Sequence, residues 1–465
     1  MDWRISPKVN AVEKTSATAA PMGLILTNNL KGMRVLVLGS GGREHAMAWK
    51  LSQSSLLDKM FIAPGNAGTD TLGENVNLDI LNFKELGDFC TAQSIDMMVV
   101  GPEAPLAGGV VDFFSANASL ADVAIIGPSR AGAQIESSKR FAKEFMDRHR
   151  IPTAKYKTFV KGEIRAAQAH LESLDPPYVV KASGLAAGKG VVVTEKLSQA
   201  KKAVSDMLKG TSFGNAGKEI IIEQFLSGIE VSMFVLTDGQ SWRMLPSAMD
   251  YKRIGDDDTG PNTGGMGAIS PVPHLTPEFM EKVKNQVIIP TIRGLERDGI
   301  PYCGFIFFGL MKVAGDPFVI EYNVRLGDPE TQVVLARLES DLLHLFDGLT
   351  TGMLSEMHVV ERDGAAAGVV LASEGYPGSY EKGKDFTALV PADLQEGGEV
   401  QMLFQSGTAK GADGVVTSGG RVATCVGLGS DLEKAVEQAY DLAGKVQFEG
   451  KIHRSDIGRL AIPVK

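Results

Sequence analysis

Several features that would narrow the function at once are scarce in this sequence. Only three of its 465 residues are cysteines, Cys90, Cys303 and Cys425, and they stand far apart. Isolated cysteines in odd number give neither a disulfide framework nor metal-ligand spacing, which suggests a reducing compartment such as the cytoplasm. No apolar run is long enough to span a bilayer. The net charge of −9 disfavours a non-specific nucleic-acid surface and leaves room for a local basic pocket.

A complete dinucleotide-binding fingerprint is also missing. Residues 39–42 form a glycine turn behind the apolar run 35–38, but Glu44 occupies the sixth position of a Gly-x-Gly-x-x-Gly pattern. No acidic residue closes the next predicted strand at 61–63, where a ribose ligand would be expected. A nicotinamide cofactor is therefore disfavoured. The turn and the predicted helix behind it can still hold a phosphate, with Arg43 nearby.

The most informative stretch is 177–193, in which two β-branched apolar runs flank a glycine-rich segment. The pattern predicts strand, loop, strand. A Walker A loop does not fit, because three residues rather than four separate Gly184 from Gly188, and a strand follows Lys189. A hairpin lid over a nucleotide triphosphate fits better, with Lys181 reaching in from the first strand. The alternative is an ordinary surface hairpin.

The chain divides by pattern and composition. Residues 1–32 are polar and lack a period, which fits a disordered tail, a misplaced start codon or, with less support, a transit segment. From residue 33 the pattern is α/β, with strand-like runs that suit a parallel sheet. From about residue 364 short alternating runs separated by glycine turns predict a smaller, mostly-β domain with one helix over 431–446. There is no internal repeat or heptad array.

Loops that follow strand-like runs in the N-terminal part carry candidate ligand-binding residues. Gly42, Asn66 and Glu103 each follow such a run. Because loops at the carboxyl ends of parallel strands line one crevice, we expect these residues to face one pocket. Each alone is more often a turn residue than a ligand.

Residues 137–146 predict an amphipathic helix with Phe141 and Phe145 toward the core. Lys139 and Lys143 share the neighbouring face, and the pattern alone favours a solvated basic helix.

A second candidate site lies further along, where 318–325 reads as a strand. A period of two places Glu321, Asn323 and Arg325 on one face. A carboxylate and an amide oxygen at this spacing suit Mg²⁺, with nucleotide phosphates completing the shell, and Arg325 can hold an oxyanion. The alternative is a solvated strand face with an incidental ion pair. Asp328 is predicted to cap the next helix, with Pro329 at its first position.

Two further segments suit a nucleotide and its partner substrate. A strand over 219–226 runs into a bend, and Glu230 follows it, so that a hinge for adenine and a carboxylate for ribose hydroxyls are available. The long loop 259–268 is glycine-rich and carries Asn262 and Thr263. Loops of this length without a hydrophobic period are either disordered or functional.

Six stretches taken together resemble those of the phosphoribosylamine–glycine ligase (glycinamide ribonucleotide synthetase) family of ATP-grasp enzymes. They are residues 39–45, 63–69, 100–106, 181–190, 260–267 and 325–332. The resemblance runs from residue 33 to the end. It implies a Rossmann-like phosphate- and substrate-binding domain at 33–135, an ATP-grasp domain at 136–363 with a lid at about 155–222, and a mostly-β domain at 364–465.

The resemblance also implies a reaction. ATP would phosphorylate the carboxylate of glycine, and 5-phosphoribosylamine would attack the acyl phosphate in de novo purine synthesis. Mg²⁺ or Mn²⁺ would assist. A monomer or homodimer in the cytoplasm is expected, with no nucleic-acid or membrane partner.

Site residues follow by motif match alone. ATP phosphates would be held by Lys143, Lys181, Ser183, Gly184, Gly188, Lys189 and Gly190. The adenine hinge would be Glu223, Gln224, Phe225 and Leu226, with Glu230 on the ribose. The metal ligands would be Glu321 and Asn323. The phosphoribosylamine pocket would hold Gly42, Arg43, Glu44, Asn66 and Glu103. The residues around glycine and the acyl phosphate would be Asp250, Asn262, Thr263, Gly264, Gly265 and Arg325. The catalytic residues would be Arg325, Asp250 and Lys181.

Other hypotheses remain open at this point. Another ATP-grasp carboxylate–amine ligase with a different acceptor is the nearest, although such an acceptor would not need Arg43 in the glycine turn. A nucleotide-regulated binding protein without turnover is disfavoured by the intact set Lys181, Glu321, Asn323 and Arg325.

Overall fold

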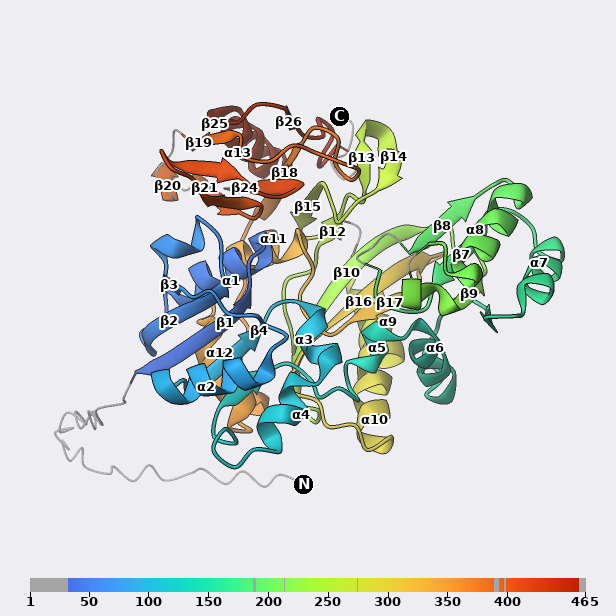
Figure 1. Ribbon diagram of the computed structural model, residues 1–465, viewed down its shortest axis with the longest axis horizontal. Helices are drawn as coiled ribbons and strands as arrows, with labels where there is room; N and C mark the ends of the chain where they lie inside the picture. Colours follow the sequence, from blue (N-terminus) through green and yellow to red (C-terminus); the bar gives the residue numbers. More distant parts are fainter. Residues whose placement is uncertain are drawn as a thin grey trace, which may run out of the picture. The chain divides into compact units, whose positions relative to one another are not determined.

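A computed structural model describes residues 32–186, 190–212, 214–273, 275–388, 393–396 and 399–459 (Figure 1). The predicted N-terminal segment lies outside these residues, apart from Gly32. Among the described residues, no helix is both long and apolar enough to cross a membrane.

The N-terminal part is built on a parallel sheet, as the sequence predicts. The strand order is β3-β2-β1-β4-β5, and every pair is parallel. The strands are β1 (Met33–Gly39), β2 (Leu57–Pro64), β3 (Glu74–Asn75), β4 (Met97–Val100) and β5 (Ala124–Ile126), with helices α1 (Gly42–Leu51), α2 (Phe83–Gln93), α3 (Glu103–Gly108) and α4 (Val110–Ser115) between them. All four residues of β4 are buried, which explains why this strand is a continuous apolar run.

The central segment contains a four-stranded antiparallel sheet in the order β11-β10-β16-β17. Its strands are β10 (Ile229–Thr237), β11 (Trp242–Met244), β16 (Gly304–Val313) and β17 (Asp316–Asn323). The neighbouring helices are α5 (Gln134–Ser137), α6 (Lys139–Arg148), α9 (Pro277–Val283) and α10 (Ile289–Arg297). The paired strands β10 and β16 supply buried residues to the core that also holds Phe145.

The structure corrects the interpretation of α6 as a solvated basic helix. Phe145 is fully buried and Phe141 partly so, as the period predicts. Lys143, however, has only 2% of its surface exposed. Its ammonium donates to Thr153 Oγ1 at 2.6 Å and lies 3.4 Å from Glu223 Oε1. The helical period could not reveal this, because both partners come from later in the chain.

The glycine-rich hairpin is also confirmed in its described part. β7 (Tyr178–Ala182) pairs antiparallel with β8 (Val191–Thr194), and the sheet order is β6-β9-β7-β8. The remaining elements of this subdomain are β6 (Tyr156–Val160), β9 (Glu219–Glu223), α7 (Ile164–Glu172) and α8 (Leu197–Lys209). The tip of the loop, residues 187–189, lies outside the described residues.

Two boundaries differ from the sequence prediction near the second candidate site. Strand β17 ends at Asn323, so Arg325 lies beyond it in a bend rather than on the strand face. The physical reason is that the backbone N–H of Val324 donates to Glu136 Oε2 at 2.7 Å instead of continuing the ladder. Helix α11 (Glu330–Arg337) is capped by Pro329, and Asp328 is not its N-cap.

The C-terminal part is mostly β, as predicted, but its main sheet recruits two strands from the central segment. The order is β12-β15-β18-β24-β21-β20, and β26 (Lys451–Ile452) also pairs with β18. The strands are β12 (Met249–Asp250), β15 (Gly267–Ser270), β18 (Ala365–Ser373), β20 (Asp393–Glu396), β21 (Glu399–Gln405) and β24 (Arg421–Gly429). Helix α13 (Leu432–Lys445) packs on this sheet, which shares a buried core with it. The glycine-rich loop therefore leads straight into β15.

Smaller elements complete this region. A second sheet follows the order β22-β23-β19-β25, from β19 (Asp385–Ala388), β22 (Thr408–Lys410), β23 (Val415–Thr417) and β25 (Val446–Gln447). Helix α12 (Leu342–Thr350) follows α11. The hairpin β13 (Arg253–Gly255) and β14 (Thr259–Asn262) carries the glycine-rich loop at its end.

Candidate active site

Arg325 lies where the two predicted half-sites meet. Its Nη2 lies 2.8 Å from Glu136 Oε1 and 3.1 Å from Asn323 Oδ1, and its Nε lies 3.4 Å from Glu103 Oε2. Burial disfavours the charged guanidinium, but Glu136 and Glu103 raise the pKa of Arg325 above its usual value, so it stays a cation. The Nε is buried and has no hydrogen-bond partner among the described residues. The guanidinium is thus a buried cation held between the carboxylates of Glu103 and Glu136, and its planar fork suits an oxyanion.

Glu321 is an ionised carboxylate in a positively charged surrounding. Burial opposes its ionisation, yet the charges of Lys252, Lys139, Lys181 and Arg325 hold its pKa below the usual value. Glu321 and Asn323 supply a carboxylate and an amide oxygen, the donor types that hard divalent cations prefer. Within the described part of the chain, no three His, Cys, Asp or Glu side chains lie close enough to hold a metal alone. The two residues thus fit a divalent cation only if phosphate oxygens complete its shell.

A buried cluster of two lysines and one glutamate lies at the predicted nucleotide hinge. Glu223 Oε2 is 2.9 Å from Lys181 Nζ, and its Oε1 is 3.4 Å from Lys143 Nζ. Oε1 has no hydrogen-bond partner among the described residues. Burial lowers the pKa of Lys143 to about 8, against the opposing pull of Glu223. The cluster therefore places two buried cations on one carboxylate at the predicted nucleotide hinge.

The pKa of Lys143 gives a pH dependence with a definite sign. A bound phosphate favours the protonated amine, so ATP binding above pH 8 must be accompanied by proton uptake. We expect ATP affinity to fall by about fivefold between pH 8 and pH 9 and to be nearly flat below pH 7. Titration calorimetry at several pH values measures this. Lys143→Arg should keep its affinity to pH 9, and an unchanged pH profile in Lys143→Met would contradict the assignment.

The predicted adenine hinge presents one exposed apolar side chain, that of Phe225. Gln224 donates its N–H to the Lys155 carbonyl at 2.8 Å. Phe225 is 41% exposed, and Leu226 is partly buried. An adenine ring could stack on such an apolar surface.

The described part of the lid loop is tied to α6. Ser183 is buried, its carbonyl accepts from Lys139 N at 2.9 Å, and its Oγ accepts from Arg140 N at 3.2 Å. Gly184 donates to the Ala216 carbonyl at 3.2 Å, and the Gly190 carbonyl accepts from Ala182 N at 2.8 Å. The predicted phosphate ligands Gly188 and Lys189 lie outside the described residues.

The predicted ribose ligand and the predicted catalytic aspartate share one lysine. Glu230 forms an ion pair with Lys252, and Lys252 also acts on Asp250 and Glu321. Burial raises the pKa of Asp250 well above its usual value. The charge of Lys252 lowers this pKa in part, whereas nearby carboxylates raise it further. When it is ionised, a carboxylate of raised pKa is a stronger base than an ordinary aspartate.

The glycine-rich loop is held in a tight turn at Thr263. Thr263 donates its N–H at 2.8 Å and its Oγ1 at 2.9 Å to the Lys252 carbonyl, and its Oγ1 accepts from Gly265 N at 2.9 Å. Asn262 ends β14, and Gly265 has φ +114°. A Cβ on Gly265 would lie 2.3 Å from Pro329 Cδ. Both the backbone angle and the space therefore require glycine there.

Gly265→Ala tests this turn. We expect product formation to fall by about 10- to 100-fold, because the loop must shift away from Pro329 and misplace its ligands. Gly162→Ala is the matched control, since Gly162 has φ +103° but open space around its Cβ position. Steady-state assays with both variants separate contact from backbone strain, and equal losses would contradict the role of the close approach.

Several residues that were predicted to bind phosphoribosylamine lie around the start of α1. Glu44 Oε2 accepts from Gly41 N at 2.7 Å, and its Oε1 lies 2.6 Å from Arg43 Nε. Arg43 Nη1 donates to the Leu326 carbonyl at 3.2 Å, next to Arg325. The Asn66 amide donates to the Ser40 carbonyl at 2.9 Å and to the Gln405 carbonyl at 2.8 Å. Arg43, Glu44 and Glu103 thus gather near Arg325, while Asn66 ties the glycine turn to β21.

Gly42 lies at the start of α1 against the C-terminal part. A Cβ on Gly42 would lie 2.6 Å from both Gln332 Nε2 and Ser406 Oγ. A side chain at position 42 would therefore have to displace the ends of these two side chains.

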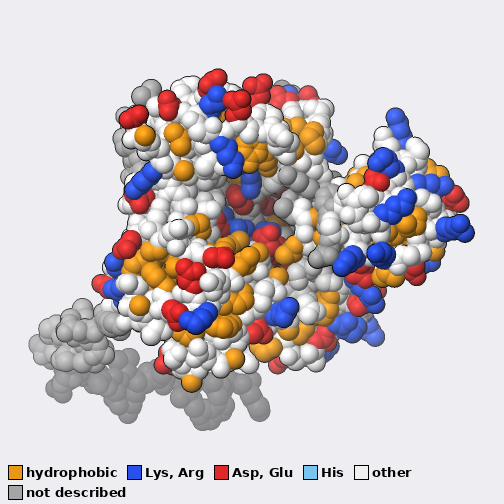
Figure 2. Space-filling view, viewed as in Figure 1, with side chains coloured by type: hydrophobic (Ala, Val, Ile, Leu, Met, Phe, Trp, Pro, Cys, Tyr) orange, Lys and Arg blue, Asp and Glu red, His pale blue; other side chains and the backbone are white. Residues whose placement is uncertain are grey.

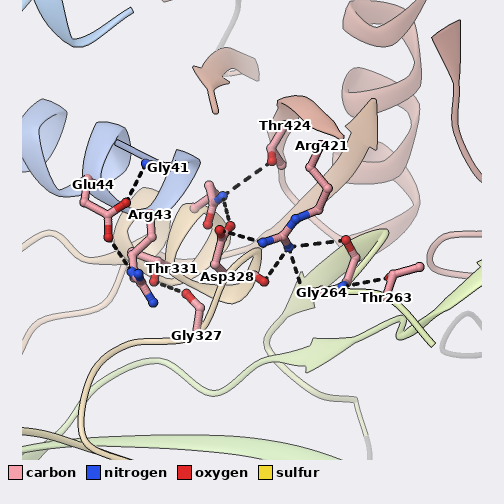
Figure 3. Close-up of polar contacts among 12 residues, drawn as sticks. Gly41, Arg43, Glu44, Thr263, Gly264, Gly327, Asp328, Thr331, Arg421 and Thr424 are labelled. Atoms are coloured by element: carbon pink, nitrogen blue, oxygen red, sulfur yellow. Dashed lines mark hydrogen bonds and ion pairs between the residues drawn. The ribbon is translucent and has the colours of Figure 1, made fainter. Parts of the chain in front are cut away.

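The residues that sequence reasoning missed are Glu136, Lys139, Lys252, Asp328 and Arg421. Glu136 directly precedes the predicted helix 137–146, Lys139 lies near its start, and Lys252 stands two residues after Asp250, so proximity in sequence was the one signal available. Asp328 and Arg421 are 93 residues apart and meet only in the fold (Figure 3). Acidic and basic side chains are also visible within a recess near the middle of the face in Figure 2.

The fold combines these sheets with a glycine-rich hairpin, with two lysines on the carboxylate of Glu223, and with strand β17, which carries Glu321. This combination defines an ATP-grasp protein. A biotin carboxylase structure from Campylobacter jejuni shares the fold alone, at 15% identity and a TM-score of 0.68, over 91% of this chain and 94% of that chain. Family models match in three consecutive blocks, namely the phosphoribosylglycinamide synthetase N domain at 33–136, the ATP-grasp (A) domain at 137–331 and the C domain at 366–460. The chain belongs to the phosphoribosylglycinamide synthetase family.

Individual relatives agree over almost the whole chain. It is 47% identical to a phosphoribosylamine–glycine ligase of Pseudomonas aeruginosa, over 92% of this chain and 98% of the relative. The value for a Vibrio parahaemolyticus relative of the same name is 46%, over 92% and 99%. A crystal structure of phosphoribosylamine–glycine ligase from Thermotoga maritima superimposes with a TM-score of 0.78 at 36% identity, over 91% and 100%.

Proposed function

We propose that this chain ligates glycine to 5-phosphoribosylamine at the expense of ATP. Glycinamide ribonucleotide, ADP and phosphate would be the products, as the name shared by the close relatives suggests. The observation that carries the proposal is the position of Arg325, which contacts Asn323 on the nucleotide side and Glu103 on the N-terminal side. One cation at this junction can serve both half-reactions.

The reaction would run in two steps. A carboxylate oxygen of glycine attacks the γ-phosphorus of ATP, the bond to the β-phosphate oxygen breaks, and ADP leaves. The amine of phosphoribosylamine then attacks the carbonyl carbon of glycyl phosphate, inorganic phosphate leaves, and the amine loses a proton. We assign that proton to Asp250, whose pKa burial raises.

The residues would act mainly through charge and position. Lys143 and Lys181 would hold ATP phosphates, with the lid residues Ser183, Gly184, Gly188, Lys189 and Gly190 over them. Phosphoryl transfer needs charge neutralisation more than a covalent nucleophile, and these groups with Arg325 supply it. Glu321 and Asn323 would hold Mg²⁺ or Mn²⁺ together with ATP oxygens, and the ion would neutralise charge developing on the phosphates.

The remaining assignments concern binding. Glu223 to Leu226 would form the hinge for adenine and Glu230 the ribose ligand, once Lys252 releases it. Gly42, Arg43, Glu44, Asn66 and Glu103 would surround phosphoribosylamine. Asn262, Thr263, Gly264 and Gly265 would surround glycine. We propose a cytoplasmic location on the strength of three unpaired cysteines.

The test is ADP release by the purified chain with Mg-ATP, with glycine and freshly generated phosphoribosylamine each added or left out. Release that requires both supports the proposal. Release with other acceptors but not with phosphoribosylamine would keep the ATP-grasp chemistry and overturn the substrate. ATP binding without release under any combination would indicate a binding protein.

A further inference from the structure

A single arginine of the C-terminal part reaches into the candidate active site. Arg421 opens β24, and its guanidinium is largely buried, with 20% of the side chain exposed. Nη1 donates to the Gly264 carbonyl at 2.7 Å and to the Asp328 carbonyl at 2.6 Å. Nη2 lies 2.8 Å from Asp328 Oδ2. Figure 3 shows these contacts converging on the one guanidinium.

The first group that Arg421 holds is the glycine-rich loop. A second side chain from the C-terminal part also binds Gly264 of this loop, because Gly264 donates its N–H to the Tyr376 hydroxyl at 3.0 Å. The carbonyl of Gly264 is thus held by Arg421 and its N–H by Tyr376. Gly265 also approaches Pro329 closely, since a Cβ on Gly265 would lie 2.3 Å from Pro329 Cδ. The path of the loop past Gly264 is therefore set by residues outside its own hairpin.

The second group is Asp328, which lies beneath the N-terminal glycine turn. A Cβ on Gly41 would lie 3.5 Å from Asp328 Oδ2, and Gln332 Nε2 donates to Asp328 Oδ1 at 2.8 Å. Burial opposes ionisation of Asp328, but Arg421 and Arg43 hold its pKa below the usual value. Asp328 is thus an anion that pairs with Arg421 of the C-terminal part and is further stabilised by the charge of Arg43 in the predicted phosphoribosylamine pocket.

We infer that Arg421 is a positioning residue that fixes the glycine-binding loop relative to the phosphoribosylamine pocket and so couples the two half-reactions. The inference rests on the proposed function of these two half-sites. Arg421 touches neither the reacting atoms nor the nucleotide cluster. It joins Gly264 of one half-site to Asp328 beside the other, with a planar fork that one lysine amine cannot reproduce. Its loss should leave glycyl phosphate formed but poorly placed for the amine.

The test compares Arg421→Met, Arg421→Lys and a matched control, Arg243→Met. Arg243 also donates to backbone carbonyls of a distant segment, those of Met357 and Ser355, away from the site. ADP and ligated product are measured separately, together with KM for ATP and the fraction of folded protein by near-UV circular dichroism. Wild-type protein should release one ADP per product.

For Arg421→Met we expect product formation to fall by about 10- to 100-fold, which corresponds to the loss of a hydrogen-bonded charge contact. The ratio of ADP to product should rise above one, because misplaced glycyl phosphate is lost to water, while KM for ATP stays within about twofold. Arg421→Lys should show the same uncoupling to a smaller extent. Arg243→Met should keep a ratio of one.

Three results would overturn the inference. A ratio of one in both Arg421 variants, with activity falling only in step with the folded fraction, would leave Arg421 a merely structural residue. Equal uncoupling in Arg243→Met would attribute the effect to general loosening of the fold. If Arg421→Met does not fold, Arg421→Lys decides by the same ratio. If wild-type protein forms no product from glycine and phosphoribosylamine, the proposed function itself fails, and the coupling role falls with it.

Discussion

Glu321→Ala should reduce product formation by about a thousandfold or more, because several kcal/mol of charge stabilisation are lost at the phosphates. Glu321 is the carboxylate around which Lys139, Lys181, Lys252 and Arg325 gather. Its removal takes away one of two predicted metal ligands and leaves four cations facing one another. Coupled detection of ADP and product at saturating ATP measures the loss.

The control for Glu321 lies on the same strand. Asp316 begins β17, is 55% exposed and pairs with Lys282 at 2.8 Å, so Asp316→Ala removes a carboxylate from β17 without touching the site. We expect Asp316→Ala to stay within about twofold of wild-type activity, since exposed ion pairs contribute little. A Glu321→Ala variant within tenfold of wild type would contradict the assigned role.

Arg325→Met should lower both activity and stability. Activity should fall by about 100- to 1,000-fold, because the cation shared by the two half-sites is lost at the reacting carboxyl. The free energy of unfolding should fall by about 3–5 kcal/mol at neutral pH, because Glu136 is left buried without its partner. Activity assays and urea denaturation measure the two effects.

The two effects of Arg325→Met can be separated. Burial already raises the pKa of Glu136. Without Arg325 the folded state should therefore hold the Glu136 proton to higher pH than the unfolded state, so the stability loss should grow between pH 5 and pH 8. Glu136→Gln in the Arg325→Met background should restore stability but not activity, since glutamine can still accept from Val324 N. A double variant that regains activity would contradict a direct role for Arg325.

Much of the fold follows from local patterns in the sequence. The apolar run that precedes Glu103 is strand β4, and it is unbroken because all four of its residues are buried in a parallel sheet. The hairpin of β7 and β8 could be predicted in the same way, since β-branched residues flank a glycine loop. The mostly-β C-terminal part and its helix α13 were predicted from alternation and glycine turns.

The departures have long-range causes. Arg325 leaves the predicted strand because Glu136, 188 positions away in sequence, takes the N–H of Val324. Asp328 does not cap α11 because Arg421 and Gln332 hold its carboxylate. Strand β15 joins the C-terminal sheet through β18, a pairing across about a hundred residues. None of these partners leaves a local period or turn signal.

The candidate site shows the same division. The motifs in 181–190, 260–267 and 325–332 could each be recognised in the sequence, and the resemblance to a family assigned them to one active site. The contacts that join these motifs could not be predicted. They are the carboxylates around Arg325, the lysine shared by Glu230 and Asp250, and the contacts of Arg421. Ion pairs between distant segments depend on the fold as a whole.

The central claim is that this site activates glycine as an acyl phosphate, and isotope transfer tests it most directly. Wild-type protein is given Mg-ATP, phosphoribosylamine and glycine labelled with ¹⁸O in both carboxyl oxygens. Attack of the carboxylate on the γ-phosphorus followed by attack of the amine on carbon must leave one carboxyl oxygen on phosphate. The account predicts one ¹⁸O in the inorganic phosphate for each ligated product, read by mass spectrometry. Product formed with unlabelled phosphate would contradict it.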